Sequence, residues 1–547
     1  MDVTQTPTPE QQVSSLLEEK QRFSKSRLWQ LQRQFFEQQG IQAWRQGTVP
    51  HYITSNPHIA NAYAQVVLGF LRDSYTISNT QDSGVTAINP DQPIYILELG
   101  SGSGRFAYHF LKKFHAAYAQ SSLTQHSVKY ILTDFTAENL NYWKTHPSLQ
   151  PYLEQGLLDF ACFDAENDQS ITLNYSGETL KPDGLSNPMV VIANYVLDSI
   201  PQDLFLIQNG QLSESLVTLA VPGTEPDIND PEILSQVDVS YTQQAIDSEF
   251  YDDAGLNEVL KAYQQTLTDT YLLFPHIALR CLNRLRKLCG DRLLFLSSDK
   301  GFSREEDLLF RCEPGIVLHG NCFSLMVNYH AVGQYVRQQG GVYLNVPHRH
   351  NSINICAAAF GKHPQNYPET SLAFNSAIVQ NNPDDFFTLR QVLTEHYGTL
   401  SIEQILAYLR LSGWDGAVFM DCFSVIMAKL ENLSSPMQEE LFWAAQNIWD
   451  NYYPIGEQRD LPFYLGMLLY TMEYFPEALE YLQHSLQIYG DDPNTLYNMG
   501  MCYYRLRQLN KSTEYINQTL ELKPEFEPAK AMRIKLKSEA LRLKKVI

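Results

Sequence analysis

Between Ile94 and about Gly361, short apolar runs alternate with segments of helical periodicity. Such alternation joins parallel strands through helical crossovers, so it predicts an α/β domain with a doubly wound sheet. We expect strands at Ile94–Leu97, Tyr130–Thr133, Leu158–Cys162, Met189–Ala193 and Leu293–Leu296, and helices at Gly104–Gln120, Thr136–Leu149, Asp198–Leu204 and Tyr271–Leu288.

The end of this region has a different rhythm. The helical stretch YHAVGQYVRQQ is followed by GGVYLNV and, after a loop, by INICAAAF. Two strands with a short return predict an antiparallel addition at the C-terminal edge of the sheet. An acid-rich insertion, about residues 220–270, separates the fourth and fifth strands; it either shapes a substrate site or forms a solvated acidic lid.

A glycine-rich turn follows the first predicted strand. In ILELGSGSGRF an acid, Glu98, precedes Gly100, Gly102 and Gly104. This order, acid-x-Gly-x-Gly-x-Gly, resembles the first motif of class I S-adenosylmethionine-dependent methyltransferases. Glycines let the backbone lie against a cofactor where a Cβ would collide, and Glu98 is suited to receive the amino group of that cofactor.

Other nucleotide-binding turns fit less well. In the dinucleotide fingerprint GxGxxG, counted from Gly100, Arg105 stands where the third glycine belongs. Counted from Gly102, Ala107 completes the weaker GxGxxA form, so a dinucleotide-dependent dehydrogenase stays a rival interpretation. The GK[ST] of a phosphate-binding P-loop is absent.

The next two strands end in acids as well. Asp134 closes YILTD, and a carboxylate there can accept from both ribose hydroxyls of the cofactor. Asp164 and Ala165 follow the third strand, where the adenine amino group is usually received. Aspartates are common at strand–loop junctions in any protein, which is the alternative explanation for Asp164.

Four stretches resemble, in order and spacing, the motifs of MidA-type methyltransferases, over roughly residues 45–360. They are HYITSNPHIANAYAQVV, ILELGSGSGRF, VVIANYVLDSIPQDLF and FSLMVNYHAVGQYVRQQGG. The family includes a complex I assembly factor that methylates a protein arginine. The resemblance implies a class I methyltransferase (Rossmann-like) fold with S-adenosylmethionine as cofactor. Because the eight cysteines are scattered without metal-ligand spacing, we expect no metal site.

The same resemblance suggests individual site residues. Thr54 and Ser55 match the family's segment ahead of the second helix, and Asn194 and Asp198 match its motif after the fourth strand. We therefore expect Thr54 and Ser55 to help hold the cofactor, and Asn194 and Asp198 to position the acceptor and handle its proton. The sequence departs from the family at Tyr195, His58 and Ser103; the first two stand where the family has glutamates, which weakens the case for an arginine acceptor.

From about Asn382 onward the sequence predicts helices alone, and the last ninety or so residues contain a repeat. Leu465-Gly466 recurs as Met499-Gly500, 34 positions later, and small residues at the packing positions keep this register. That period and pattern are typical of tetratricopeptide repeats, which bind peptides in a concave groove.

These observations predict four regions. Residues 1–90 form a helical extension over the cofactor site, with helices at about Leu16–Gln46 and Pro57–Asp73. Residues 91–365 form the methyltransferase domain, residues 366–456 a helical linker, and residues 457–547 the repeats with a capping helix.

The formal charge of −21 argues against nucleic acid as a partner. The sequence shows neither a secretory leader nor a run of about eighteen apolar residues, so we expect a cytoplasmic protein without a membrane partner. The leading hypothesis is a methyltransferase acting on a protein recruited through the repeats. The alternatives are a catalytically altered scaffold and a small-molecule methyltransferase.

Overall fold

The structure is a computed structural model that describes residues 14–78, 87–223, 232–247, 249–319, 322–350, 352–363 and 367–544, together with 227, 230 and 365. These residues form two compact units. The first extends to Thr388 and the second begins at Leu389, so the boundary falls inside helix α12 (Pro383–His396).

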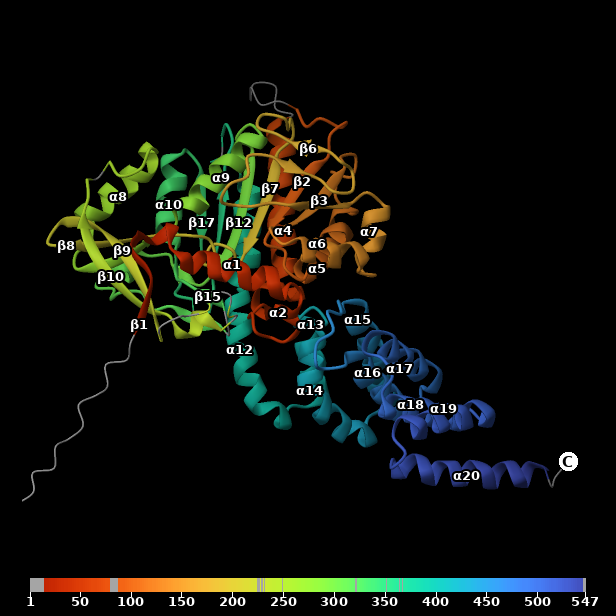
Figure 1. The fold of residues 1–547 in the computed structure, drawn as a ribbon. Coiled ribbons are helices and arrows are strands. Elements are labelled where there is room, and N and C mark those ends of the chain that lie inside the picture. Colours follow the sequence, from red (N-terminus) through yellow and green to blue (C-terminus); the bar gives the residue numbers. More distant parts are fainter. Residues whose placement is uncertain are drawn as a thin grey trace, which may run out of the picture. The chain divides into compact units, whose positions relative to one another are not determined.

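A seven-stranded sheet forms the centre of the first unit, in the order β17-β18-β12-β7-β2-β3-β4 (Figure 1). The five strands from β12 to β4 are parallel, while β18 runs antiparallel to both β12 and β17. Both the predicted parallel sheet and its antiparallel edge are thus confirmed. The strands are β2 (Ile94–Leu99), β3 (Val128–Asp134), β4 (Leu158–Cys162), β7 (Met189–Asn194), β12 (Leu293–Asp299), β17 (Val342–Asn345) and β18 (Asn354–Ala359).

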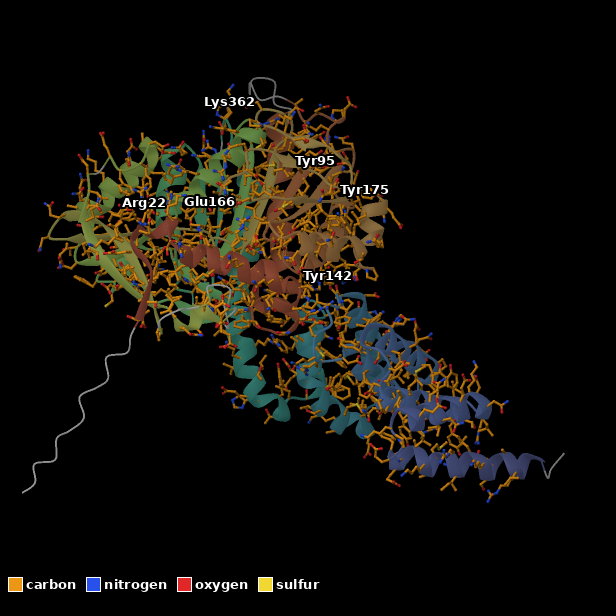
Figure 2. All side chains as sticks on the ribbon, viewed as in Figure 1. Arg22, Tyr95, Tyr142, Glu166, Tyr175 and Lys362 are labelled. Carbon is orange, nitrogen blue, oxygen red and sulfur yellow. The ribbon has the colours of Figure 1, made fainter. Side chains whose placement is uncertain are left out.

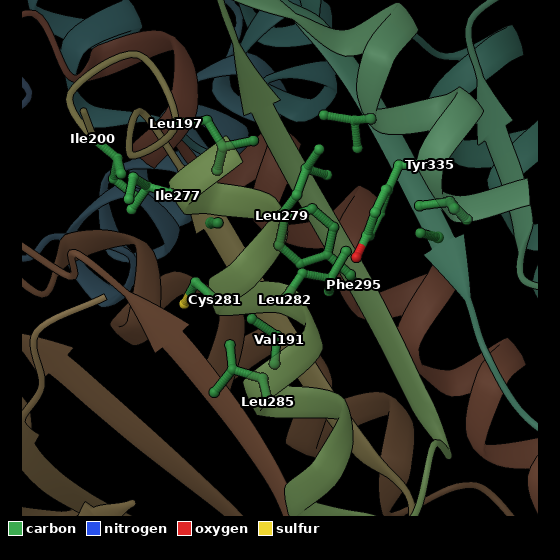
Figure 3. Packing of buried hydrophobic residues seen from close by; sticks show 14 of the residues in the cluster. Val191, Leu197, Ile200, Ile277, Leu279, Cys281, Leu282, Leu285, Phe295 and Tyr335 are labelled. Carbon is green, nitrogen blue, oxygen red and sulfur yellow. The ribbon is translucent and has the colours of Figure 1, made fainter. Parts of the chain in front are cut away.

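Helices cover both faces of this sheet because its strands are apolar throughout. On one face, alternate strand residues such as Val191 and Phe295 pack with Leu279, Leu282 and other residues of α9 in the main core, as Figure 3 shows. On the other face, Phe110 of α5 lies 5.3 Å from the ring of Tyr130. The covering helices include α4 (Pro57–Ser78), α5 (Arg105–Tyr118), α6 (Ala137–Thr145), α7 (Gln150–Glu154), α9 (His276–Leu288), α10 (Tyr329–Gln338) and α11 (Pro368–Phe374).

A second, antiparallel sheet lies beside the first and contains the N-terminal strand. Its order is β1-β9-β8-β11, with β10 also paired to β9. The expected helix over Leu16–Gln46 is therefore wrong at its start: β1 is a strand because it finds a partner in β9, and tertiary pairing overrides a weak helical pattern. The elements are β1 (Ser14–Arg22), α1 (Arg27–Gln39), α2 (Gln42–Arg45), β8 (Asp203–Gln208), β9 (Gln211–Pro222), β10 (Asp238–Ala245) and β11 (Thr270–Phe274).

The acid-rich insertion is built into this sheet. Strand β10 pairs with β9, and α8 (Ala254–Thr266) places Leu256, Val259 and Leu260 in the main core. Asp253, one of its acids, caps α8 by accepting hydrogen bonds from the N–H groups of Gly255 and Leu256. The described part of the insertion is therefore not a solvated lid.

Two further expected helices are corrected. Asp198–Leu204 is a turn that leads into β8, because Pro201 has no N–H to donate and the following DLFLIQ is largely buried between β9 and β11. The helix expected to begin at Tyr271 begins at His276 instead. Strand β11 occupies Thr270–Phe274, and Pro275 separates the strand from α9.

Short elements complete the first unit. They are α3 (Tyr52–Ser55), the two-stranded ribbon of β5 (Ile171–Thr172) and β6 (Thr179–Leu180), the pair β13 (Gly301–Phe302) and β16 (Val327–Asn328), and the hairpin of β14 (Val317–His319) and β15 (Cys322–Ser324).

The second unit is helical, as predicted. Two successive helix pairs repeat at a spacing of 34 residues, since α17 starts at Phe475 and α19 at Leu509. A Cβ on Gly466 would lie 2.8 Å from Leu482, and a Cβ on Gly500 would lie 2.9 Å from Ile516, so each glycine permits the same close helix contact. The helices are α13 (Ile402–Leu411), α14 (Gly416–Lys429), α15 (Ser435–Asp450), α16 (Leu461–Thr471), α17 (Phe475–Tyr489), α18 (Pro493–Arg505), α19 (Leu509–Leu522) and α20 (Glu527–Lys544).

Across the residues that the structure describes, none of the helices combines the length and apolarity needed to cross a membrane.

Candidate functional site

A cavity of about 370 Å³ opens at the carboxyl ends of β2, β3, β4 and β7. The chain reverses direction across the sheet at β2, with β3 and β4 on one side and β7 on the other, and ligands of open α/β sheets bind at such a switch point. The volume lies in the range of small-ligand sites. Its walls include four of the predicted site residues: Gly100, Asp134, Asp164 and Ala165.

The outer wall of the cavity comes from the N-terminal segment. Trp29 and Arg33 of α1 and Trp44 of α2 line it, with Phe36 6.0 Å from the Trp44 ring. The Arg33 guanidinium lies 4.6 Å from the centre of the Phe135 ring. Three aromatic side chains and a cation therefore face the strand ends, which suits a ligand with a flat ring and polar substituents.

The glycine turn adopts backbone angles that favour glycine. Gly100, Gly102 and Gly104 have φ of +60°, +51° and +78°, and Gly104 directly precedes α5. A Cβ on Gly100 would lie 2.8 Å from Val196, and one on Gly102 would lie 2.7 Å from the Trp44 ring. The turn is thus packed against the residues that enclose the cavity.

Asp134, at the end of β3, ties the next strand to this turn. Its carboxylate accepts hydrogen bonds from the N–H of Gly102 at 3.3 Å, the N–H of Thr136 at 3.0 Å and the amide of Asn139 at 3.0 Å. Burial raises the pKa of Asp134, and these hydrogen bonds oppose the rise. The carboxylate is therefore held in one orientation at the cavity wall.

Asp164 and Ala165 lie in the loop after β4. Arg33 Nη1 donates to Asp164 at 2.9 Å, and the N–H of Glu166 donates at 2.9 Å. Burial acts to raise the pKa of Asp164, but these donors and the Arg33 charge lower it overall. Glu166 (labelled in Figure 2) also lines the cavity, and its carboxylate forms an ion pair with Lys25 at 3.3 Å.

Glu98 does not line the cavity. It is 4% exposed and accepts a hydrogen bond from the Tyr130 hydroxyl at 2.9 Å, on the sheet face covered by α5. Burial raises the pKa of Glu98 to about 8, Asp134 adds to the rise, and hydrogen bonds from Tyr130 and Ser101 oppose it. In the folded chain this carboxyl is protonated at neutral pH.

The raised pKa of Glu98 predicts a pH effect on stability. Between about pH 4.5 and 8 the folded chain holds a proton on Glu98 that the unfolded chain releases. The stability that this proton contributes is complete below that window and is lost as the pH rises through it. The free energy of unfolding should fall by up to about 1.4 kcal/mol per pH unit from this group. Urea unfolding of Glu98→Gln should lack this slope, whereas the exposed control Glu37→Gln should keep it; equal slopes would contradict the prediction.

Asn194 and Asp198 flank a strained residue. Tyr195 has φ of +54°, a backbone angle that is costly for a bulky side chain, and it lines the cavity. Asn194 Oδ1 accepts from the hydroxyls of Tyr63 at 3.0 Å and Ser298 at 2.8 Å. Asp198 is buried and lines a smaller, adjoining cavity instead of the first one.

Thr54 and Ser55 are buried in α3, and their hydroxyls donate to the carbonyl of His51 at 3.3 and 2.7 Å. They do not line the cavity. The same holds for Gly102 and Gly104, which act through the backbone of the turn.

Several residues of the cavity wall could not be expected from the sequence, among them Arg33 and Trp44. In the sequence, Phe36 can be recognised only as part of an apolar helix face. Arg33 stands four residues before Glu37, so it suggests an ordinary helix ion pair, which it also makes at 3.3 Å. Only the tertiary fold shows that these side chains face the strand ends.

Comparisons with known proteins concern the same part of the chain. Residues 75–288 match a family model described as "Putative S-adenosyl-L-methionine-dependent methyltransferase". This range contains the glycine turn, Asp134, Asp164 and the strand that ends at Asn194.

Two solved structures from Burkholderia thailandensis are also similar. An uncharacterized protein is 13% identical, covering 59% of this chain and 73% of its own, with a TM-score of 0.35. A member of the same superfamily, bound to S-adenosyl-homocysteine, is 12% identical, covering 56% and 77%, with a TM-score of 0.35.

One curated relative, Intraflagellar transport protein 70A of Danio rerio, is 35% identical over 65 residues, or 12% of this chain. The match spans 10% of the length of that protein. The matched residues 75–288 include four of the seven strands of the central sheet, and the second unit contains helical repeats.

Proposed function

We propose that this chain is an S-adenosylmethionine-dependent methyltransferase that modifies a protein recruited through its C-terminal repeats. The observation that carries the proposal is the cavity at the switch point, where Asp134 binds the N–H of Gly102 and both neighbouring strands contribute to the wall. The family match over residues 75–288 supports the same cofactor.

In this proposal each residue has a separate role. Asp134 would accept from the ribose hydroxyls, and Asp164 with the backbone of Ala165 would receive the adenine. Trp29 and Phe135 line the same cavity and would provide apolar contact for the adenine ring. The donor set fits, because carboxylates and aromatic rings line one cavity. When bound, the cofactor supplies a methyl group already activated by a sulfonium.

The remaining predicted residues act around this centre. Gly100, Gly102 and Gly104 shape the turn, and Glu98 lies beneath it as a buried carboxyl that ionises as a cationic amino group approaches. Thr54 and Ser55 hold the segment ahead of α4. Asn194 and Asp198 position the acceptor, and Asp198 handles its proton.

We propose that helices α16–α20 are tetratricopeptide repeats that bind the protein substrate. The 34-residue spacing, the matching contacts of Gly466 and Gly500, and the partial match to Intraflagellar transport protein 70A support this assignment. We also propose that the chain is organised in four regions: the N-terminal extension (1–90), the methyltransferase domain (91–365), a helical linker (366–456) and the repeats (457–547).

Calorimetric titration with S-adenosylhomocysteine tests the cofactor assignment. We expect the wild type to bind in the micromolar range or tighter, and Asp134→Ala to bind at least tenfold more weakly, a loss of about 1.4 kcal/mol. Asp159→Ala is the matched control, because Asp159 is also buried and accepts three backbone N–H bonds but does not line the cavity. Failure of the wild type to bind would overturn the proposal and favour a scaffold role for the chain.

A further inference from the structure

Two smaller cavities lie near the main one and are linked to it by shared wall residues. A cavity of about 60 Å³ shares Phe36, Tyr195 and Ser199 with it and is also lined by Asp198. A third cavity, about 190 Å³, shares Lys300 and Ser324 with the second. Tyr195 therefore borders the first and second cavities, and Lys300 borders the second and third.

The second cavity borders a buried pair of carboxyl groups. Asp198, after β7, and Asp299, at the end of β12, are 5% and 0% exposed. The N–H of Asp198 donates to Asp299 Oδ2 at 3.1 Å, so the two residues lie in direct contact. Burial raises the pKa of both, and the neighbouring charge raises that of Asp299 further. Such a pair holds one proton and a single negative charge.

Lys300 balances that charge. Its side chain is half-buried, lines both smaller cavities and acts electrostatically on Asp198. Within the described part of the chain, no carboxylate lies within ion-pair distance of its ammonium group. The other titratable groups around the pair include Tyr63, Tyr195, His319, Cys322 and Tyr329, and burial disfavours the charged form of each. The second cavity is consequently close to neutral.

Building on the proposed function, we propose that the methyl acceptor is a phenolic hydroxyl, either of a tyrosine side chain or of a small phenol. A guanidinium or ammonium acceptor would bring a second cation beside Lys300 in a small buried space, with one carboxylate to serve both. A carboxylate acceptor would be repelled by the Asp198 carboxylate. A neutral hydroxyl avoids both repulsions, from Lys300 and from Asp198.

The third cavity suits the aromatic ring of such an acceptor. Most of its lining is apolar, including Leu204, Leu272, Phe302, Leu308, Leu325 and Met326. An apolar cavity of about 150 Å³ already holds a benzene ring, so this one has room for a substituted ring. The phenol enters with its hydroxyl toward Asp198 and its ring against these side chains.

The transfer balances with the groups present. The ionised Asp198 carboxylate accepts the phenolic proton while the phenolic oxygen forms a bond to the methyl carbon. The carbon–sulfur bond breaks, and its electron pair stays on sulfur, so the products are an aryl methyl ether, S-adenosylhomocysteine and protonated Asp198. A phenol, with a pKa of about 10, matches a carboxylate of raised basicity better than an aliphatic alcohol does. Asp299 is a positioning residue that orients Asp198 and shares its proton.

The test uses the full chain and S-adenosylmethionine labelled in the methyl group. The acceptors are 4-methylphenol, a tyrosine peptide, the same peptide with arginine in place of tyrosine, and a protein extract that is hydrolysed to amino acids afterwards. We expect label in an aryl methyl ether; label in 4-methylphenol alone identifies a small-molecule source, and label in tyrosine identifies a protein source. Label on nitrogen alone, or no aryl methyl ether with any acceptor, would overturn this inference. The proposed function would still stand in that case if the chain binds S-adenosylhomocysteine.

Two variants separate the charge argument from a structural effect. Lys300→Met should raise methylation of the arginine peptide at least tenfold over the wild type, whereas Lys287→Met, an exposed lysine of α9, should not. Asp299→Asn should move the acidic limb of the pH–rate profile by about one pH unit to higher pH, because the proton shared with Asp299 no longer stabilises the ionised Asp198 carboxylate. An unchanged pH profile with a uniformly lower rate would assign Asp299 a structural role instead.

Discussion

The Gly102→Val variant is expected to bind S-adenosylhomocysteine about a hundredfold more weakly than the wild type, a loss of about 2.8 kcal/mol. Gly102 has φ of +51°, where a β-branched side chain is strained, and a Cβ there would lie 2.7 Å from the Trp44 ring. Trp44 lines the cavity, so the clash displaces part of the binding wall. Calorimetric titration measures the loss.

The matched control is Gly156→Val. Gly156 has φ of +71°, and a Cβ added there would meet no atom within 4 Å, so this variant suffers the same backbone strain without a clash. It should bind S-adenosylhomocysteine as the wild type does. If both variants bind normally, the turn and Trp44 do not form the wall of the cofactor site.

The Trp143→Ala variant should lower the free energy of unfolding of the first unit by about 3–5 kcal/mol. Trp143 is fully buried, its ring lies 5.8 Å from that of Phe160, and its indole N–H donates to the carbonyl of Gly102 at 2.9 Å. Removing it leaves a cavity and an unpaired carbonyl beneath the glycine turn. Hydrogen exchange of β2–β4 in urea follows this unit separately from the helical one.

Tyr175→Ala serves as the comparison, because Tyr175 is 66% exposed and lies on the same unit (Figure 2). A surface substitution of this kind should change the free energy of unfolding by less than about 0.5 kcal/mol. A loss for Trp143→Ala no larger than that would show that the turn is supported by other contacts.

The central sheet could be predicted from the sequence because its signals are local. Each parallel strand is an apolar run such as VVIAN, and the turn after β2 carries its glycines where the backbone needs positive φ. Asp134 could be expected at the cavity for the same reason, since the ends of neighbouring parallel strands meet at one edge.

The features that the sequence does not reveal depend on contacts between distant residues. The local pattern of β1 does not indicate a strand, because its residues alternate only weakly in burial. Its partner, β9, lies far along the chain, so the pairing that makes it a strand is not visible locally. Arg33 and Trp44 reach the cavity through the placement of α1 and α2. Asp299 ends an apolar strand like any other acid, and only the fold brings it against Asp198.

The pairing of β1 with β9 also sets the order in which this molecule assembles. Lys20 bonds to Thr218, 198 positions away, so the N-terminal strand has no partner until β9 has been synthesised. Trp29 and Arg33, which follow β1 directly, reach their places over the strand ends only after that long loop closes, and contacts of such separation form late and slowly. The wall that Trp29 and Arg33 contribute to the cavity therefore forms only after the chain as far as β9 is present, although β2, β3, β4 and β7 precede β9 in the sequence.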